Sequence, residues 1–222
     1  MDCGFFPAFL RMDGKESLVV GGGAVALRKI SSLVASGSRV LVVSPEVRPE
    51  ISEFDGVELR KSVYDSSIMR PSDRHWWLVF AATNRPDVNA QVCADARAAG
   101  IWACNCSASD DGDLISPASR TVGEITIAVS TGGGSPGFAA QLADQAVAGI
   151  SPDQKILAGL LPRWRMQIRK AFDHEATRRE LMRRITGDEM LAAIKSGGEK
   201  AAADYFDRLV AEAKFHHGRR GQ

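Results

Sequence analysis

A glycine-rich turn between an apolar run and an amphipathic segment most constrains how this chain can fold. The apolar run at residues 17–20 leads directly into three glycines, as a buried parallel strand would. After the turn, apolar residues recur at helical spacing through 25–34. The turn at 21–26 reads G-x-G-x-x-A, the fingerprint of a strand–turn–helix unit that holds a dinucleotide by its phosphates.

Each small residue of this fingerprint has its own task. Gly21 permits the tight turn, Gly23 lets the backbone approach a pyrophosphate, and Ala26 allows close packing of helix on strand. The free N–H groups at the start of the helix then face the phosphates. A strand before the motif and a helix after it are both expected, so we favour dinucleotide binding over a plain glycine-rich turn.

Strand and helix signals alternate through the first half of the chain, which is typical of a doubly wound parallel sheet. Apolar or alternating runs predict further strands at 40–44, 57–63, 76–83 and 101–106. A helix is expected at 86–100, with Pro at its start and Gly at its end.

The pattern changes in the second half of the chain. Residues 114–150 combine a strand with a helix, and only helical signals follow. We therefore predict an α/β protein of three parts: a Rossmann-like nucleotide-binding domain at 1–113, a small α/β segment at 114–150 and a helical domain at 151–222.

Composition excludes several protein classes. The 222 residues are 45% hydrophobic and 25% charged, which is typical of a soluble globular protein. The longest apolar run, 76–82, is too short to span a bilayer, and the N-terminus lacks the pattern of a secretory signal. Four cysteines are too few for a disulfide framework at this length, so we expect a cytoplasmic protein.

The net charge of +1 conceals a basic C-terminal third. Such asymmetry suggests an anionic partner, although solvated helix faces commonly explain a run of charges. The basic residues of the densest part are Arg163, Arg165, Arg169, Lys170, Arg178, Arg179, Arg183 and Arg184.

The end of the second expected strand bears on the choice of nucleotide. An acidic residue there would hold the ribose hydroxyls of NAD, and Glu46 could reach back to do so. Ser44, with Arg48 nearby, could instead accommodate the 2′-phosphate of NADP. We expect NAD.

Three stretches occur together in a characteristic order and spacing: FPAFLRMDGKESLVVGGGAVALRK, VFAATNRPDVN and ITIAVSTGGGSP. In this the chain resembles the precorrin-2 dehydrogenases, the family of the N-terminal half of siroheme synthase and of its stand-alone relatives. The resemblance covers essentially the whole chain.

The resemblance implies NAD-dependent oxidation of precorrin-2 to sirohydrochlorin in siroheme biosynthesis. Some family members also insert ferrous iron as a ferrochelatase. It further implies a homodimer, built largely by the middle segment, and a helical part that covers the tetrapyrrole cleft. The cofactor contacts carried over are Gly21, Gly23, Ala24, Val25, Ser44, Pro45, Glu46, Ala82 and Thr83. The arginine-rich end suits a carboxylate-rich tetrapyrrole, because guanidinium groups pair with carboxylates.

The stretch ACNCSASDDGDLISPA departs from the family pattern at its aspartate, the residue thought to act as general base. Ser107 stands at that position, so Asp110 or Asp111 could supply the carboxylate instead. Alternatively, hydride transfer needs little base catalysis, or the chain is a chelatase or tetrapyrrole-binding relative that has lost the dehydrogenase step. We expect a working dehydrogenase, with Ser107, Asp110 and Asp111 as the candidate catalytic residues.

Cys104 and Cys106 lie two apart, so both would face one side of a strand and could hold a soft metal. Two thiols without a second pair or a nearby histidine make a poor zinc site. We expect them to be small core residues and predict no metal site.

Overall fold

The computed structural model describes residues 4–70, 74–108 and 111–220, with side chains as far as Phe215. It divides into two compact units. The first consists of residues 1–116 together with 130–135, and the second of 117–129 together with 136–222.

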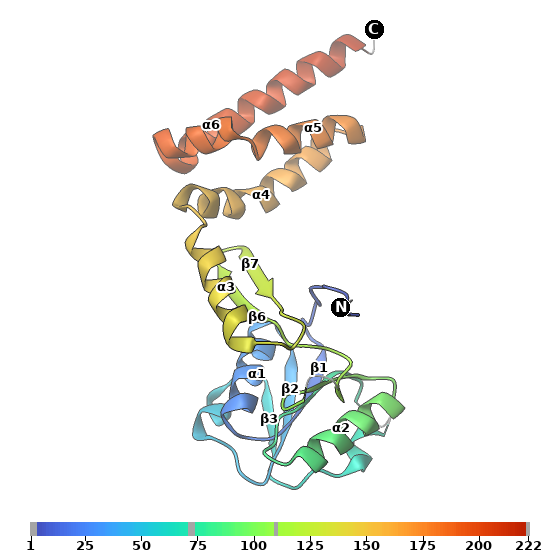
Figure 1. Ribbon diagram of the computed structural model, residues 1–222. Helices are drawn as coiled ribbons and strands as arrows, with labels where there is room; N and C mark the ends of the chain where they lie inside the picture. The colour runs from blue at the N-terminus through green and yellow to red at the C-terminus, as the bar shows by residue number, and fades with distance from the viewer. Residues whose placement is uncertain (1–3, 71–73, 109–110, 221–222) are drawn as a thin grey trace. The chain divides into compact units, whose positions relative to one another are not determined.

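The first unit is built on a five-stranded sheet with the strand order β3-β2-β1-β4-β5, in which all neighbours are parallel. This confirms the predicted Rossmann-like doubly wound fold. The strands are β1 (Glu16–Val20), β2 (Arg39–Val43), β3 (Val57–Arg60), β4 (Trp76–Ala81) and β5 (Trp102–Asn105). Figure 1 labels β1, β2 and β3 of this sheet with α1 and α2.

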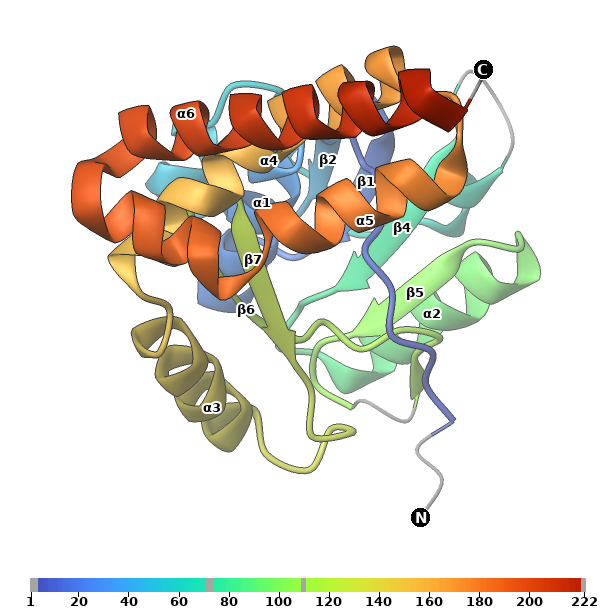
Figure 2. The same cartoon turned by 90° about the horizontal axis from the view of Figure 1, so that it is seen from above.

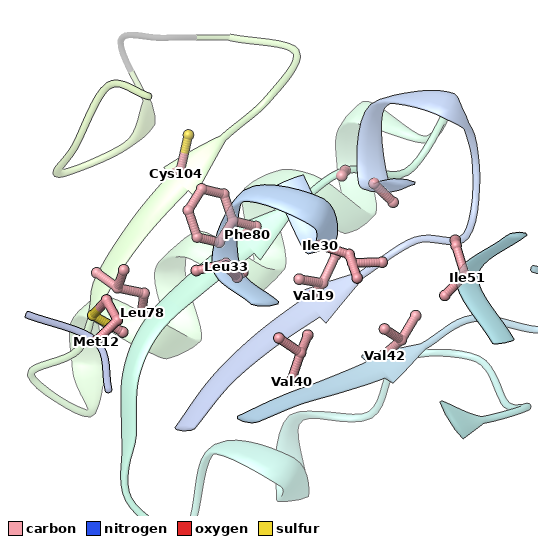
Figure 3. Packing of buried hydrophobic residues seen from close by; sticks show 12 residues of the cluster. Met12, Val19, Ile30, Leu33, Val40, Val42, Ile51, Leu78, Phe80 and Cys104 are labelled. Atoms are coloured by element: carbon pink, nitrogen blue, oxygen red, sulfur yellow. The ribbon is translucent and has the colours of Figure 1, made fainter. Parts of the chain in front are cut away.

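The helices of this unit cover opposite faces of the sheet. Helix α1 (Ala24–Ala35) packs Ile30 and Leu33 against Val19 and neighbouring strand residues, which form the core shown in Figure 3. Helix α2 (Pro86–Ala98) packs Val92 and other residues on the alternate face, where Leu18 lies. Because both faces are buried, the central strands read as unbroken apolar runs rather than as alternating ones.

The predicted strands at 57–63, 76–83 and 101–106 are two or three residues longer than β3, β4 and β5, whereas those at 17–20 and 40–44 differ from β1 and β2 by a single residue at one or both ends. The expected strand 57–63 ends at Arg60, because the chain turns there and the Ser62 N–H donates to the Arg60 carbonyl at 2.9 Å. Two 3₁₀ helices that the sequence did not predict, η1 (Pro49–Glu53) and η2 (Ser66–Met69), follow β2 and β3. Both begin in the loops at the carboxyl ends of these strands, where ligands bind in this type of sheet.

The described residues of the second unit form a hairpin and a series of helices, the last of which is kinked at Gly197 and Gly198, where φ and ψ are not helical. Strands β6 (Ala118–Val122) and β7 (Ile125–Val129) are antiparallel, and α3 (Pro136–Ala148) packs against them. Helices α4 (Pro152–Ala171), α5 (Glu175–Ile185) and α6 (Asp188–Arg220) lie side by side around a core of their own (Figures 1 and 2). None of the helices in the part of the chain that the structure describes is long and apolar enough to cross a membrane.

Trp164 lies at the centre of this helical core. Its side chain is 1% exposed and stacks on Phe206, with ring centroids 4.7 Å apart and planes within 5° of parallel. Helix α4 begins at a capping box in which Ser151 and Gln154 satisfy each other's backbone N–H groups. The cap sets where α4 begins, and the stacked rings tie α4 to α6.

We predict that Trp164→Ala destabilises the helical core by about 3–5 kcal/mol, because it leaves a large buried cavity and removes the ring stack. Amide hydrogen exchange across α4–α6 measures this loss. Met166→Ala is the matched control on the same helix, since Met166 is 52% exposed and its loss should cost within about 0.5 kcal/mol. Equal effects of the two variants would contradict the assignment of Trp164 as the core residue.

Candidate functional site

The glycine turn sits in a close gap between the ends of β2 and β4. Gly21 has a φ of +123°, and its N–H donates to the Val43 carbonyl at 2.9 Å. A Cβ at Gly21 would lie 2.3 Å from the carbonyl oxygen of Ala82. Only glycine fits both the backbone conformation and the available space.

Gly22, the variable position of the fingerprint, is restricted just as strongly. A Cβ there would lie 2.1 Å from the Glu46 carbonyl oxygen, and the Gly22 carbonyl accepts the N–H of Arg48 at 2.9 Å. The loop after β2 is therefore fastened to the turn through main-chain contacts. The sequence analysis assigned no role to Gly22, although the run of three glycines was a visible signal of close backbone approach.

Gly23 differs from its two neighbours because nothing lies within 4 Å of where its Cβ would be. It is the N-cap of α1, where no side chain caps the helix and no acidic residue occupies the first turn. The helix N-terminus therefore presents N–H groups and a positive dipole end to open space, which suits a phosphate. A Cβ at this position would fill the cradle.

A cavity of about 1180 Å³ opens at this corner of the sheet. This volume lies slightly above the range of about 300–1,000 Å³ common for small-molecule sites, so the cavity has room for a large ligand. The candidate cofactor residues that line it are Gly21, Gly23, Ser44, Pro45, Glu46, Ala82 and Thr83. Ala24 and Val25 do not line the cavity; they form the first turn of α1, and Val25 packs against the sheet core.

The hydroxyl of Ser44 is engaged in a hydrogen bond with the main chain of its own turn. It donates to the Glu46 carbonyl at 2.6 Å and so closes the turn after β2. The Glu46 side chain is exposed at the mouth of the cavity. The carboxylate of Glu46, rather than Ser44, is thus the group available to ribose hydroxyls.

A buried asparagine joins the cavity wall to the loop after β5. The Asn89 Oδ1 accepts the hydroxyl of Thr83 at 2.7 Å and the Thr83 N–H at 3.0 Å. Its Nδ2 donates to the Thr83 carbonyl and to the Ser107 hydroxyl, each at 3.1 Å. Asn89 is fully buried, so these bonds hold Thr83 and Ser107 in a fixed relation.

A second asparagine gathers the candidate catalytic residues. The Asn105 Oδ1 accepts the Ser107 hydroxyl at 2.8 Å, and its Nδ2 donates to Asp111 Oδ2 at 3.4 Å. Ser107 and Asp111 are therefore brought together around Asn105, while Asp110 lies outside the described residues. Asn89 and Asn105 were not among the predicted site residues. The signal for each was a polar residue at a position expected to be buried, in a helix for Asn89 and at a strand end for Asn105.

Cys104 and Cys106 belong to the packed face beneath α1. The hydrogen bond between the two thiols and the charge of Lys29 lower the pKa of Cys104 to about 7, against the opposing effect of burial. Among the residues that the structure describes, no group of three or more His, Cys, Asp or Glu side chains could hold a metal ion.

The densest run of basic residues, between Arg163 and Arg184, lies on α4 and α5. Arg179, Arg183 and Arg184 are paired with glutamates of their own unit. Other arginines are exposed on α4 and are available to an anionic ligand: Arg163, Arg165 and Arg169.

Comparison with known proteins adds three findings. The sequence model of the family described as "Putative NAD(P)-binding" matches residues 8–118. Siroheme synthases from Nitrosomonas europaea and Ectopseudomonas mendocina are 34% and 33% identical over 93% and 94% of this chain, which covers 43% and 45% of them. The chain thus spans less than half the length of these relatives. A solved structure titled SirC, precorrin-2 dehydrogenase, has a TM-score of 0.73 at 21% identity, over 94% of this chain and 100% of that one.

We predict that Gly22→Ala and Gly23→Ala differ strongly in their effect on stability. Gly22→Ala should destabilise the first unit by about 3 kcal/mol or more, because its Cβ meets main-chain atoms that cannot move aside. Gly23→Ala should change stability by less than about 1 kcal/mol, because its Cβ enters open space. Hydrogen exchange of the β1 and β2 amides measures both, and a stable Gly22→Ala protein would contradict the described geometry of the turn.

Proposed function

The chain belongs to the NAD(P)-binding family that its residues 8–118 match, and we propose that it is an NAD-dependent dehydrogenase that oxidises precorrin-2 to sirohydrochlorin in siroheme biosynthesis. The observation that carries this proposal is the open cradle at Gly23, at the head of an uncapped helix and beside a large cavity. The similarity to siroheme synthases and to a solved precorrin-2 dehydrogenase supports the choice of substrate.

The residues of the cradle fit a dinucleotide. The backbone at Gly21 and Gly23, together with the first turn of α1 at Ala24 and Val25, would hold the diphosphate. Residues 44–46 would lie at the ribose, and Ala82 and Thr83 would form the wall beside β4. When bound, the nicotinamide supplies the chemistry of a hydride acceptor.

We propose NAD rather than NADP as the nucleotide. The Glu46 carboxylate is exposed and can accept hydrogen bonds from ribose hydroxyls, whereas it would repel a 2′-phosphate. The Ser44 hydroxyl is engaged with the main chain and is not free to bind such a phosphate.

The chain must also accept the proton that substrate oxidation releases. We propose Asp111 as the base, because Asn105 holds its carboxylate beside Ser107 and within the loop at the carboxyl edge of the sheet. The Ser107 hydroxyl donates a hydrogen bond to Asn105 Oδ1 and accepts one from Asn89 Nδ2, so it serves to position this loop. Asp110 remains a second candidate for the base.

The proposal extends to partners and location. We propose an anionic tetrapyrrole as the substrate, since its carboxylates suit exposed arginines such as those of α4, and ferrous iron as a further substrate of the same chain. A homodimer through residues 114–150 is supported by the half-buried state of Ile125 and Ile127, because a hairpin covered by one helix buries too little apolar surface by itself.

The division at 1–113, 114–150 and 151–222 is part of this proposal. The free thiols of Cys93, Cys104 and Cys106 support a reducing cytoplasm.

The direct test is to incubate the purified chain with precorrin-2 and NAD and to follow NADH fluorescence. We expect one NADH per sirohydrochlorin formed, and a fall of at least tenfold in kcat/KM for Gly23→Ala, since its Cβ fills the cradle. Gly159→Ala is the matched control, because its Cβ also meets open space but lies on α4 in the other unit. Absence of NADH, with iron insertion into sirohydrochlorin intact, would favour the chelatase alternative.

We further predict that Asp111→Asn lowers kcat by about 100-fold and leaves NAD affinity unchanged, because it removes a base without touching the nucleotide cavity. Asp55→Asn, an exposed residue before the amino end of β3, is the control for the charge change. A kcat equal to that of the unmodified chain would show that Asp111 is not the base.

A further inference from the structure

The loop after β2 carries an ion pair at the ribose end of the cavity, between Arg48 and Glu50. We propose that Glu50 determines the preference for NAD over NADP, by engaging the arginine that would otherwise bind a 2′-phosphate. This inference rests on the proposed function, because it places a dinucleotide in the cavity beside Gly21–Gly23.

Arg48 is placed where a 2′-phosphate would need a cation. It lines the cavity five positions past the end of β2, and its N–H is fixed to the Gly22 carbonyl at 2.9 Å. An arginine near the end of the second strand is a general means of accommodating the 2′-phosphate of NADP in this fold. Its planar guanidinium can bind such a phosphate through two parallel hydrogen bonds.

In this chain that guanidinium is occupied. Its Nη2 and Nε donate to Glu50 Oε1 at 2.7 and 3.3 Å. The hydrogen bond from Arg48 also lowers the pKa of the Glu50 carboxyl, so the carboxylate is charged at neutral pH. Both side chains are about half exposed, at 48% and 45%, and an exposed pair of this kind contributes little to stability. Glu50 can therefore be changed without loss of the fold.

No other charged residue described at this end of the cavity offers an unpaired cation that could bind a 2′-phosphate in place of Arg48. Glu46 is exposed beside it, and Asp65 lines the same cavity. The other arginine of the lining, Arg85, is paired with Asp87 at 2.5 Å. With Arg48 neutralised by Glu50, carboxylates outnumber available cations among the described lining residues, and a doubly charged phosphate is repelled.

Calorimetric titration of the full chain with NADP and with NAD tests the proposal through binding alone. We expect Glu50→Gln to tighten NADP binding by roughly fivefold to tenfold, since it removes one negative charge and frees one guanidinium. NAD binding should change by less than about twofold, because NAD has no 2′-phosphate. Raised salt should reduce the gain, because the effect is electrostatic and exposed to solvent.

Two controls separate this mechanism from a general change of charge. Glu53→Gln removes the same charge from the same 3₁₀ helix, but the carboxylate that pairs with Arg48 is that of Glu50, so NADP affinity should stay unchanged. The double variant Arg48→Ala with Glu50→Gln should lose the gain, because the phosphate-binding group is absent.

The inference is overturned if Glu50→Gln leaves NADP affinity unchanged, if Glu53→Gln gives the same gain, or if the gain persists without Arg48. These results leave NAD binding by the unmodified chain intact, so they contradict the role of Glu50 alone. Failure of the unmodified chain to bind either nucleotide overturns the proposed function and this inference together.

Discussion

The contact of the glycine turn with the ends of two neighbouring strands is the constraint on which the rest of the site depends. At Gly21 and Gly22 the main chain lies so close to the carbonyls of Ala82 and Glu46 that no side chain fits. This closeness brings the N-terminus of α1 to the edge where β1, β2 and β4 end. The strand order reverses direction at β1, and ligands of such sheets bind at that point.

The same contact links the N-terminus of α1 with the loops around it. The Gly22 carbonyl holds the loop after β2, and the wall at Thr83 continues through Asn89 and Asn105 to Asp111. Side-chain amides are well suited to this role, because each can donate and accept at once. The proposed dinucleotide site and the candidate base thus share one hydrogen-bonded framework.

The fold was largely predictable from the sequence, because short stretches of consecutive residues indicate each strand and helix. Apolar runs mark strands buried on both faces, and the glycine fingerprint marks one strand-to-helix junction. Strand ends were less predictable, since they depend on turns such as that at Ser62. The positive φ of Gly21 and the open space at Gly23 agree with the predicted fingerprint, whereas their contacts with a nucleotide stay a prediction.

Other parts of the site could not be predicted, because they depend on contacts between distant segments. Asn89 and Ser107 are 18 positions apart, and only the sheet brings them together. Gly22 is required to be glycine by a carbonyl of another loop. Arg48 was visible as a possible phosphate ligand, but its engagement by Glu50 depends on the 3₁₀ turn that the sequence did not indicate. Which side chains pair in a loop depends on the path of the main chain in space, and the sequence pattern does not reveal that path.

Titration calorimetry of the unmodified chain with NAD in the absence of tetrapyrrole tests the central claim most directly. The account predicts saturable binding of one NAD per chain, because the cradle at the head of α1 is already formed. No heat of binding at millimolar NAD, together with unchanged amide signals at residues 21–25, would contradict it.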